Sequence, residues 1–128
     1  MELGLLYEFE APQPWDEPHP WGQRKAERKG YHDAIEQIVR ADQKGFHTAW
    51  LVEHHFREGR SHMPCSEAVL GALSQITKDI RLGFGVTLMP HEFIHPARVA
   101  EKVATVDVLS KGRVEWGIGR STPMEQAA

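Results

Sequence analysis

The sequence predicts an α/β fold with a parallel sheet, corresponding to about the first four β/α units of a (β/α)8 TIM-type barrel. Segments with a strand pattern alternate with segments of helical period along the 128 residues, in the order βα-βα-βα-β. The strand segments are continuous apolar runs, as in parallel strands that are covered on their faces. A whole barrel of this type needs about 250 residues, so we expect residues 1–128 to form one domain, the N-terminal half of a truncated chain or gene fragment. The alternative is a complete small α/β sandwich of the doubly wound type.

Four apolar runs are the predicted strands, at residues 3–9, 48–52, 80–89 and 113–118. The third run contains Gly83 and Gly85. Glycine within a strand weakens it and often marks a place where a ligand or another backbone comes close. Either a flat ligand ring or a tightly packed helix would explain these two glycines.

Three segments of helical period separate the strands. Residues 11–30 hold four prolines and are predicted to be a long loop, so the first helix is expected from Tyr31 onwards. Ser66 is the predicted N-cap of the second helix, Pro96 opens the third, and Gly112 ends it. The expected buried faces are Tyr31, Ala34, Ile35, Ile38 and Val39 in the first helix, Val69, Ala72, Leu73 and Ile76 in the second, and Val99, Val103 and Val106 in the third.

Composition excludes several classes of function. The net charge of −3 and the absence of a basic tract argue against a nucleic-acid partner. No run approaches the ~20 apolar residues of a membrane helix, and the N-terminus lacks the features of a signal peptide. The single cysteine, Cys65, excludes an internal disulfide framework and is typical of a reducing cytoplasm.

The polar run Glu53, His54 and His55 directly follows the second predicted strand. In parallel α/β folds the active site forms at the carboxyl ends of the strands. A carboxylate and two imidazoles at such a place can perform acid–base chemistry near neutral pH. The alternatives are polar residues that satisfy one another, or a metal site, which is disfavoured because neighbouring strand residues point to opposite faces.

Residues 91–95 match the zinc-hydrolase pattern H-E-x-x-H, with His91, Glu92 and His95. That chemistry needs a helix, so that both imidazoles share one face. Pro90 precedes the motif and Pro96 follows it, and a residue before proline is pushed out of the helical region. We therefore predict a loop at the rim of the site and no metal.

The fourth predicted strand ends in Gly117, Gly119 and Arg120. The glycines would let backbone approach a ligand, and the arginine can pair with a phosphate or a polarised ring atom. The third glycine of a dinucleotide-binding fingerprint is absent. Taken alone, the segment fits an exposed arginine equally well.

Three stretches together resemble the bacterial luciferase-like, flavin-dependent monooxygenases. Residues 48–56 are similar to the second strand of that family, and residues 95–101 are similar to the start of its third helix. Residues 107–113, followed by 117–120, are similar to its fourth strand. Each stretch alone is a modest match to the family, whereas the order and spacing of the three together are specific for it.

The resemblance implies a barrel that binds reduced FMN at its carboxyl face and uses O2 to oxidise a small organic substrate. By position, His54 matches the family's catalytic histidine, which acts in proton transfer, with Glu53 in a supporting role. Arg120 matches an arginine that contacts the flavin. Gly85 and Val86 match a place where the family often has a non-prolyl cis peptide against the flavin ring. A separate flavin reductase is the implied partner.

The chain also departs from the family's pattern. The loop after the first strand is longer than in the light-emitting members, and Gly119 replaces a bulkier or reactive residue of some members. The second half of the barrel, which supplies much of the flavin phosphate site in the family, is missing. Two other functions stay open: a deazaflavin-dependent oxidoreductase of the same superfamily, and a non-catalytic half-barrel that serves as an assembly module. Because a half-barrel has two unpaired strand edges, we expect self-association.

Overall fold

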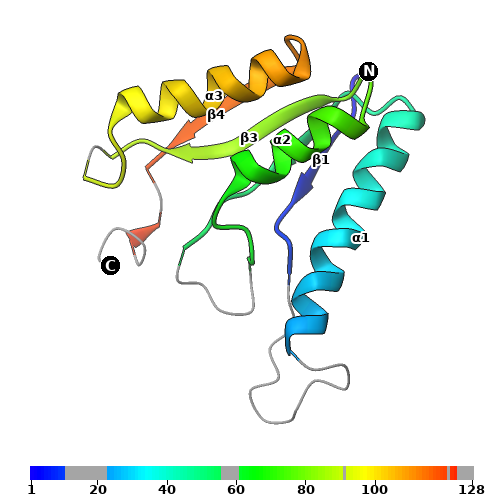
Figure 1. Cartoon of the computed structure of the whole chain (residues 1–128), viewed down its shortest axis with the longest axis horizontal. Helices are drawn as coiled ribbons and strands as arrows, with labels where there is room; N and C mark the ends of the chain where they lie inside the picture. The colour runs from blue at the N-terminus through cyan, green and yellow to red at the C-terminus, as the bar shows by residue number, and fades with distance from the viewer. Residues whose placement is uncertain (11–22, 56–60, 91, 121, 124–128) are drawn as a thin grey trace.

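A computed structural model describes residues 1–10, 23–55, 61–90, 92–120 and 122–123. The chain alternates strands and helices (Figure 1), as the sequence predicts. The elements are β1 (Gly4–Tyr7), α1 (Gln23–Gln43), β2 (Thr48–Leu51), α2 (Ser66–Ile76), β3 (Arg81–Leu88), α3 (Pro96–Ser110) and β4 (Val114–Gly119).

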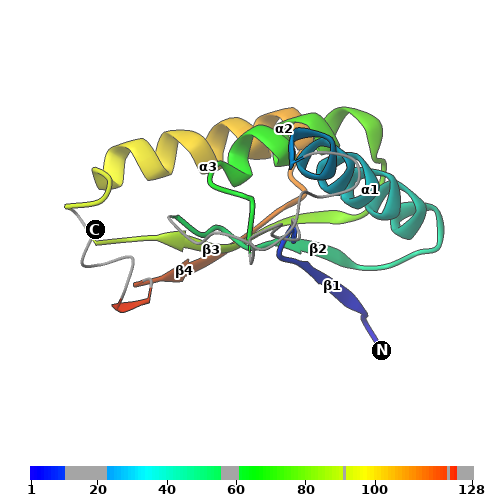
Figure 2. The same cartoon turned by 90° about the horizontal axis from the view of Figure 1, so that it is seen from below.

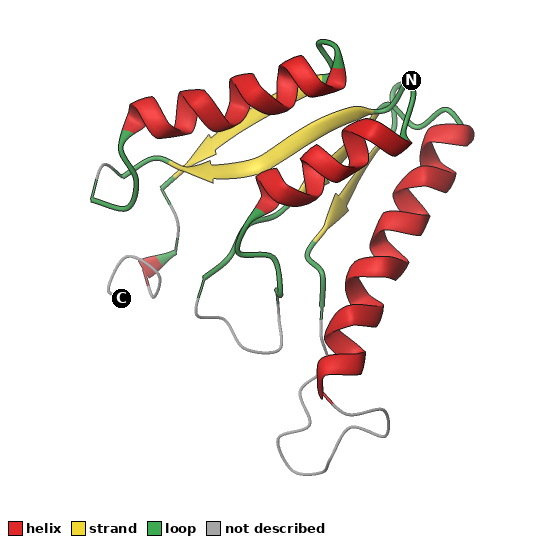
Figure 3. Cartoon of the chain, in the orientation of Figure 1, coloured by secondary structure: helices red, strands yellow, loops and turns green. Residues whose placement is uncertain are grey.

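The four strands form one parallel sheet in the order β1-β2-β3-β4. All three helices lie on one face of it (Figure 2), and the loops that follow β2 and β3 leave the sheet at its carboxyl edge (Figure 3). Leu51, Leu82 and Phe84 project from the strands into a core that is closed by Ile38 of α1 and Leu73 of α2. Burial of these apolar side chains is the main favourable contribution to folding. The predicted parallel α/β architecture is confirmed.

The opposite face of the sheet differs from the expectation of strands covered on both faces. Among the described residues no helix covers it, and Leu6 is 67% exposed there. The indole of Trp50 lies on this face against Gly83, where an added Cβ would approach the ring Cε3 to 2.4 Å. The flat ring beside Gly83 is therefore a side chain of the protein, neither a ligand nor a helix.

Two helix predictions were wrong. Helix α1 begins at Gln23, within the segment predicted as a loop, because the prolines end at Pro20 and strong helix formers follow. Gly30 is accommodated in the helix where it passes the chain after β1, since an added Cβ would lie 3.4 Å from the carbonyl oxygen of Glu10. In α2, Ile76 is 52% exposed, and the buried face is Ser66, Val69, Leu70, Leu73 and Ser74. None of the described helices is long and apolar enough to cross a membrane.

The predicted buried faces of α1 and α3 are confirmed except at Val39, which is only partly buried and does not belong to the core cluster. In α3, Val99 and Val106 are buried and Val103 packs against the core. In α1, Ala34 and Ile38 are buried, with Tyr31 and Ile35 packed beside them. Pro96 opens α3 as predicted, and His95 is its N-cap.

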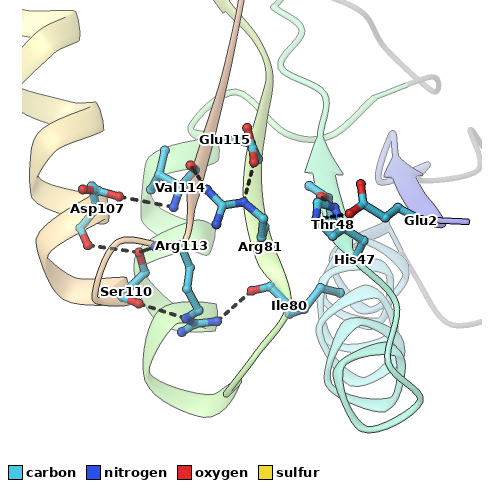
Figure 4. A network of polar contacts seen from close by, with 10 residues as sticks. All are labelled: Glu2, His47, Thr48, Ile80, Arg81, Asp107, Ser110, Arg113, Val114 and Glu115. Atoms are coloured by element: carbon cyan, nitrogen blue, oxygen red, sulfur yellow. Dashed lines mark hydrogen bonds and ion pairs between the residues drawn. The ribbon is translucent and has the colours of Figure 1, made fainter.

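Arg113, directly before β4, bonds the ends of α2 and α3 and the residue before β3 at the amino edge of the sheet. Figure 4 shows its contacts with Ser110 and Ile80. Its Nε donates to the carbonyl of Ser110 at 2.9 Å, and its Nη1 donates to the carbonyl of Ile80 at 2.8 Å and to Oγ1 of Thr77 at 2.9 Å. Its Nη2 donates to the carbonyls of Ser74 at 2.9 Å and Thr77 at 3.2 Å. The C-termini of α2 and α3 thus converge on one cation, which the helix dipoles favour.

Asp42 connects the end of α1 to the turn before β3. Its carboxylate accepts hydrogen bonds from the backbone N–H groups of Lys78, Asp79 and Ile80 at 2.8, 2.8 and 2.7 Å. Burial raises the pKa of the Asp42 carboxyl, but the three backbone donors and the positive charge of Arg113 outweigh it, so the net pKa is lowered.

Replacing Asp42 by Asn should destabilise the fold by about 1.5–3 kcal/mol at neutral pH, because an amide oxygen is a weaker acceptor than a carboxylate. Since folding lowers the Asp42 pKa, this stabilisation is complete above the unfolded-state pKa of about 3.9 and is lost as the pH falls through the folded-state value. Urea unfolding between about pH 7 and pH 2 should show the two proteins converging in acid. Asp33→Asn, at an exposed i,i+4 pair with Lys29, is the control and should change stability by less than about 0.5 kcal/mol. A constant difference at all pH values would contradict the assignment.

Candidate functional site

A cavity of about 300 Å³ opens at the carboxyl ends of β2, β3 and β4. This is the edge at which parallel α/β folds place their ligands. The residues that line it are Val52, Glu53, His54, Gly85, Val86, Leu88, Arg120 and Thr122. Five of them are the residues that the sequence nominated, Glu53, His54, Gly85, Val86 and Arg120, and the fold brings these five together although they span 68 positions of the chain.

His54 lies in the first turn of chain beyond β2 and is held there by its backbone. Its N–H donates to the carbonyl of Met63 at 3.2 Å, and the N–H of Val52 continues the sheet by donating to the carbonyl of Tyr7 at 3.0 Å. The imidazole is half-buried and lines the cavity. These two backbone hydrogen bonds therefore fix the position of the His54 Cα, from which the side chain projects.

Glu53 is bonded at both carboxylate oxygens. Its Oε2 accepts a hydrogen bond from Oγ of Ser66 at 2.7 Å, and its Oε1 lies 3.2 Å from Nε2 of His55. The side chain of Glu53 is only 12% exposed. The carboxylate consequently ties the end of β2 to the start of α2, with its negative charge at the favourable end of the helix dipole.

Ser66 contacts the site residue Glu53, although the sequence predicted a different role for it. It was predicted to be the N-cap of α2, but Cys65 occupies that position and makes no side-chain capping bond. Ser66 is the first residue of the helix, and its buried hydroxyl bonds Glu53 instead. Residues 53 and 66 meet because the chain folds back between β2 and α2, which no short sequence pattern encodes.

The H-E-x-x-H segment does not have the geometry of a zinc hydrolase. Glu92 lies in a turn, and α3 begins only at Pro96, where His95 caps it by accepting a hydrogen bond from the N–H of Ala97 at 3.2 Å. His91 lies outside the described residues. Phe93 packs against the His55 ring with centroids 5.2 Å apart. The segment is thus a loop beside the cavity, as predicted, and the described part of the chain holds no cluster of three metal-ligating side chains.

Gly85 and Val86 form the wall of the cavity on β3. The peptide bond between them is cis, as the resemblance implied. The pairing with β4 slips here, because Phe84 pairs with Trp116 and Thr87 pairs with Ile118. Three steps along β3 therefore match two along β4, which is a bulge that directs side chains toward a site.

The glycines of β4 are closely approached by β3. A Cβ added at Gly119 would lie 2.4 Å from Cγ2 of Val86, and one at Gly117 would lie 2.8 Å from the carbonyl oxygen of Phe84 and 3.1 Å from Cγ1 of Val86. The sequence suggested that these glycines let the backbone approach a ligand. In the structure, close packing against β3 explains why these positions have no side chain. Arg120 follows directly at the cavity rim, and the carbonyl of Gly119 accepts a hydrogen bond from the N–H of Met89 at 2.9 Å.

Chemically, the cavity combines an apolar wall with polar groups at its edge. Val52, Val86 and Leu88 supply the apolar part, and sequence reasoning did not nominate Val52 or Leu88 for the site. His54 and Arg120 supply a proton-transfer group and a fixed positive charge. Such a mixture is typical of pockets for small organic molecules and cofactors.

Comparison with known proteins agrees with this arrangement. The sequence profile of the luciferase-like monooxygenases matches residues 14–128. The chain belongs to the luciferase-like monooxygenase family. The predicted family is therefore confirmed over nearly the whole chain.

Individual relatives differ in the reaction that their names describe. The chain is 34% identical over 101 residues to limonene 1,2-monooxygenase of Rhodococcus erythropolis, covering 78% of this chain and 25% of that protein. It is 33% identical over 105 residues to the F420-dependent glucose-6-phosphate dehydrogenase of Amycolatopsis mediterranei, covering 80% of this chain and 31% of that protein. The similar proteins thus include both a monooxygenase and an F420-dependent dehydrogenase.

A solved structure confirms the fold. The oxygenating constituent of 3,6-diketocamphane monooxygenase from Pseudomonas putida, in complex with FMN, superposes with a TM-score of 0.76 at 25% identity. The match covers 95% of this chain and 30% of that one. The sheet and its helices are therefore part of a luciferase-like TIM barrel. The chain spans about a quarter to a third of the length of these relatives.

Replacing Ser66 by Ala should destabilise the protein by about 1.5–3 kcal/mol, because the buried Glu53 carboxylate loses a charge-assisted hydrogen bond. Thr105→Ala is the matched control, since its hydroxyl bonds only a carbonyl on the exposed side of α3 and its loss should cost less than about 0.5 kcal/mol. Urea unfolding measures both. Equal stabilities for the two variants would show that the Ser66–Glu53 bond does not hold the site.

Proposed function

We propose that this chain carries the flavin side of an FMN-dependent monooxygenase, in which reduced FMN and O2 oxidise a small organic substrate. The observation that supports the proposal is one cavity that His54, Gly85, Val86 and Arg120 line together. His54 follows β2, Gly85 and Val86 lie in β3, and Arg120 follows β4, so their meeting depends on the fold rather than on sequence proximity.

The residues present fit a flat, polar-edged ring. The cavity of about 300 Å³ lies at the lower end of the range of ligand sites, roughly 300–1,000 Å³. Val86 and Leu88 offer apolar contact, while Arg120 can pair with an electronegative ring atom or a phosphate. FMN, when bound, would supply the redox chemistry with oxygen.

His54 is the proposed catalytic residue, because it lines the cavity and an imidazole can accept or donate a proton at a ring nitrogen. Glu53 supports it indirectly. With both oxygens held by Ser66 and His55, the Glu53 carboxylate fixes the segment that carries His54. Arg120 is proposed to bind the flavin, and Gly85 and Val86 are proposed to contact its ring.

A second candidate is a deazaflavin-dependent oxidoreductase, favoured by the likeness to the F420-dependent dehydrogenase. The run Glu53-His54-His55-Phe56 leans toward the monooxygenases, although Phe56 lies outside the described residues. Under the first proposal a separate flavin reductase supplies reduced FMN, in line with a relative named as an oxygenating constituent. We propose a cytoplasmic location on the ground of the single cysteine.

The catalytic proposal predicts that His54→Ala lowers substrate-dependent O2 uptake with reduced FMN by about 10²-fold or more, the usual contribution of a general acid or base. His32→Ala on the exposed side of α1 is the control and should leave the rate unchanged. An oxygen electrode measures the rate, and parallel assays with reduced FMN and reduced deazaflavin decide between the two cofactors. Full activity of His54→Ala would refute the histidine assignment, and turnover with deazaflavin alone would refute the FMN proposal.

A third candidate is a half-barrel that serves as an assembly module. In the described sheet β1 and β4 each have one unpaired edge, and Ile118 on β4 is 62% exposed. Exposed strand edges pair readily with another copy, so we propose that the isolated chain self-associates.

Light scattering coupled to size-exclusion chromatography tests this proposal. The 128-residue chain should elute as a dimer or larger, and Ile118→Lys should shift it toward the monomer, because a charge on an edge strand opposes pairing. Lys substitution at Val108, which is 79% exposed on α3, controls for added charge. A compact monomer at all concentrations would contradict self-association.

A further inference from the structure

The side chain of Val86 fits into a notch above two glycines of β4. Between the pairs Phe84–Trp116 and Thr87–Ile118, β3 contains one residue more than β4. Val86 lies in this bulge, close to β4. An added Cβ at Gly119 would lie 2.4 Å from Cγ2 of Val86, closer than van der Waals contact allows. Val86 thus occupies the volume that a side chain at position 119 would need.

The isopropyl group of Val86 is bounded by β4 at both of its methyl groups, with Cγ2 over Gly119 and Cγ1 over Gly117. On the β4 side, a Cβ at Gly117 would meet Cγ1 of Val86 at 3.1 Å. A Val86 side chain pushed away from these two glycines has open space in the cavity, which it already lines and where it is 36% exposed.

We infer that Val86, seated against Gly119, sets the width of the cavity and so determines how closely a flat ring can be held in it. The inference rests on the proposed flavin site and adds a residue pair that tunes it. Arg120 follows Gly119 directly at the rim of the cavity, so the test must separate an effect on the flat ring from an effect on the Arg120 charge.

The packing part of the inference can be tested without a ligand. Gly119→Ala should lower the ratio of folded to unfolded protein by about tenfold, because an overpacked methyl must displace Val86. Val86→Ala in the same chain should recover most of that loss, so the two changes are not additive. Gly4→Ala in β1 is the control, since its Cβ would lie no closer than 3.5 Å to any neighbour and should be tolerated. If urea unfolding shows that the effects of Gly119→Ala and Val86→Ala on stability are additive, Val86 does not pack against position 119.

The ligand part uses quenching of flavin fluorescence by the 128-residue chain. Gly119→Ala should weaken FMN binding about tenfold, and Val86→Ala together with Gly119→Ala should restore it to within about threefold of the unaltered chain. Lumiflavin, which is the ring without ribityl phosphate, should lose affinity by the same factor as FMN, because the change acts on the ring. Val108→Ala on the exposed side of α3 should leave both affinities unchanged.

The outcomes separate this inference from the proposed function. If the unaltered chain binds FMN but Gly119→Ala binds it equally well, the width assignment is wrong and the flavin site stands. If Gly119→Ala weakens FMN and not lumiflavin, the effect arises at Arg120 and the phosphate, which also overturns the assignment. If the unaltered chain quenches neither flavin, the proposed function fails, and the ring-binding role of Val86 fails with it.

Discussion

The hydrogen bonds that the guanidinium of Arg113 donates are the polar interactions on which the arrangement of the helices and strands depends. They draw the last turns of α2 and α3 and the start of β3 to one point at the amino edge of the sheet, at distances of 2.8 to 3.2 Å. Asp42 adds the end of α1 to the same edge. With the amino ends fixed by charge-assisted hydrogen bonds, the helices and strands are held in register, and the carboxyl ends are left for the cavity. The Arg113 and Asp42 networks and the cavity thus lie at opposite edges of one sheet.

Much of the fold followed from the order of patterns along the chain. Apolar runs alternating with helical faces predicted the parallel sheet, and the position of Glu53 and His54 after the second run predicted their place at its carboxyl edge. Proline located the start of α3, because its ring fixes φ at a helical value, whereas the left-handed C-cap is Lys111, one residue before the predicted Gly112. Where a residue's meaning depends on its immediate neighbours in the chain, the sequence was sufficient. The resemblance to the family added what patterns do not contain, namely the identity of the cofactor class and the cis bond at Gly85–Val86.

The rest could not be predicted because it depends on contacts between distant segments. Ser66 was predicted to be a helix cap. In the folded chain the start of α2 lies beside the end of β2, and Ser66 is therefore the partner of Glu53. Gly83 and Gly119 were compatible with space for a ligand or with tight packing, and the structure shows the side chains of Trp50 and Val86 in that space. A glycine in a strand signals that something comes close, but the three-dimensional register decides what it is.

The contact between Trp50 and Gly83 constrains the order in which this sheet can change during evolution. An added Cβ at position 83 would fall 2.4 Å from the indole, so any side chain there is excluded while the tryptophan remains. Exchange of Trp50 for a smaller residue leaves a gap that a later substitution at position 83 can fill, whereas the reverse order passes through a severely overpacked intermediate. Descendants of this sequence should therefore lose the tryptophan first and gain the side chain second.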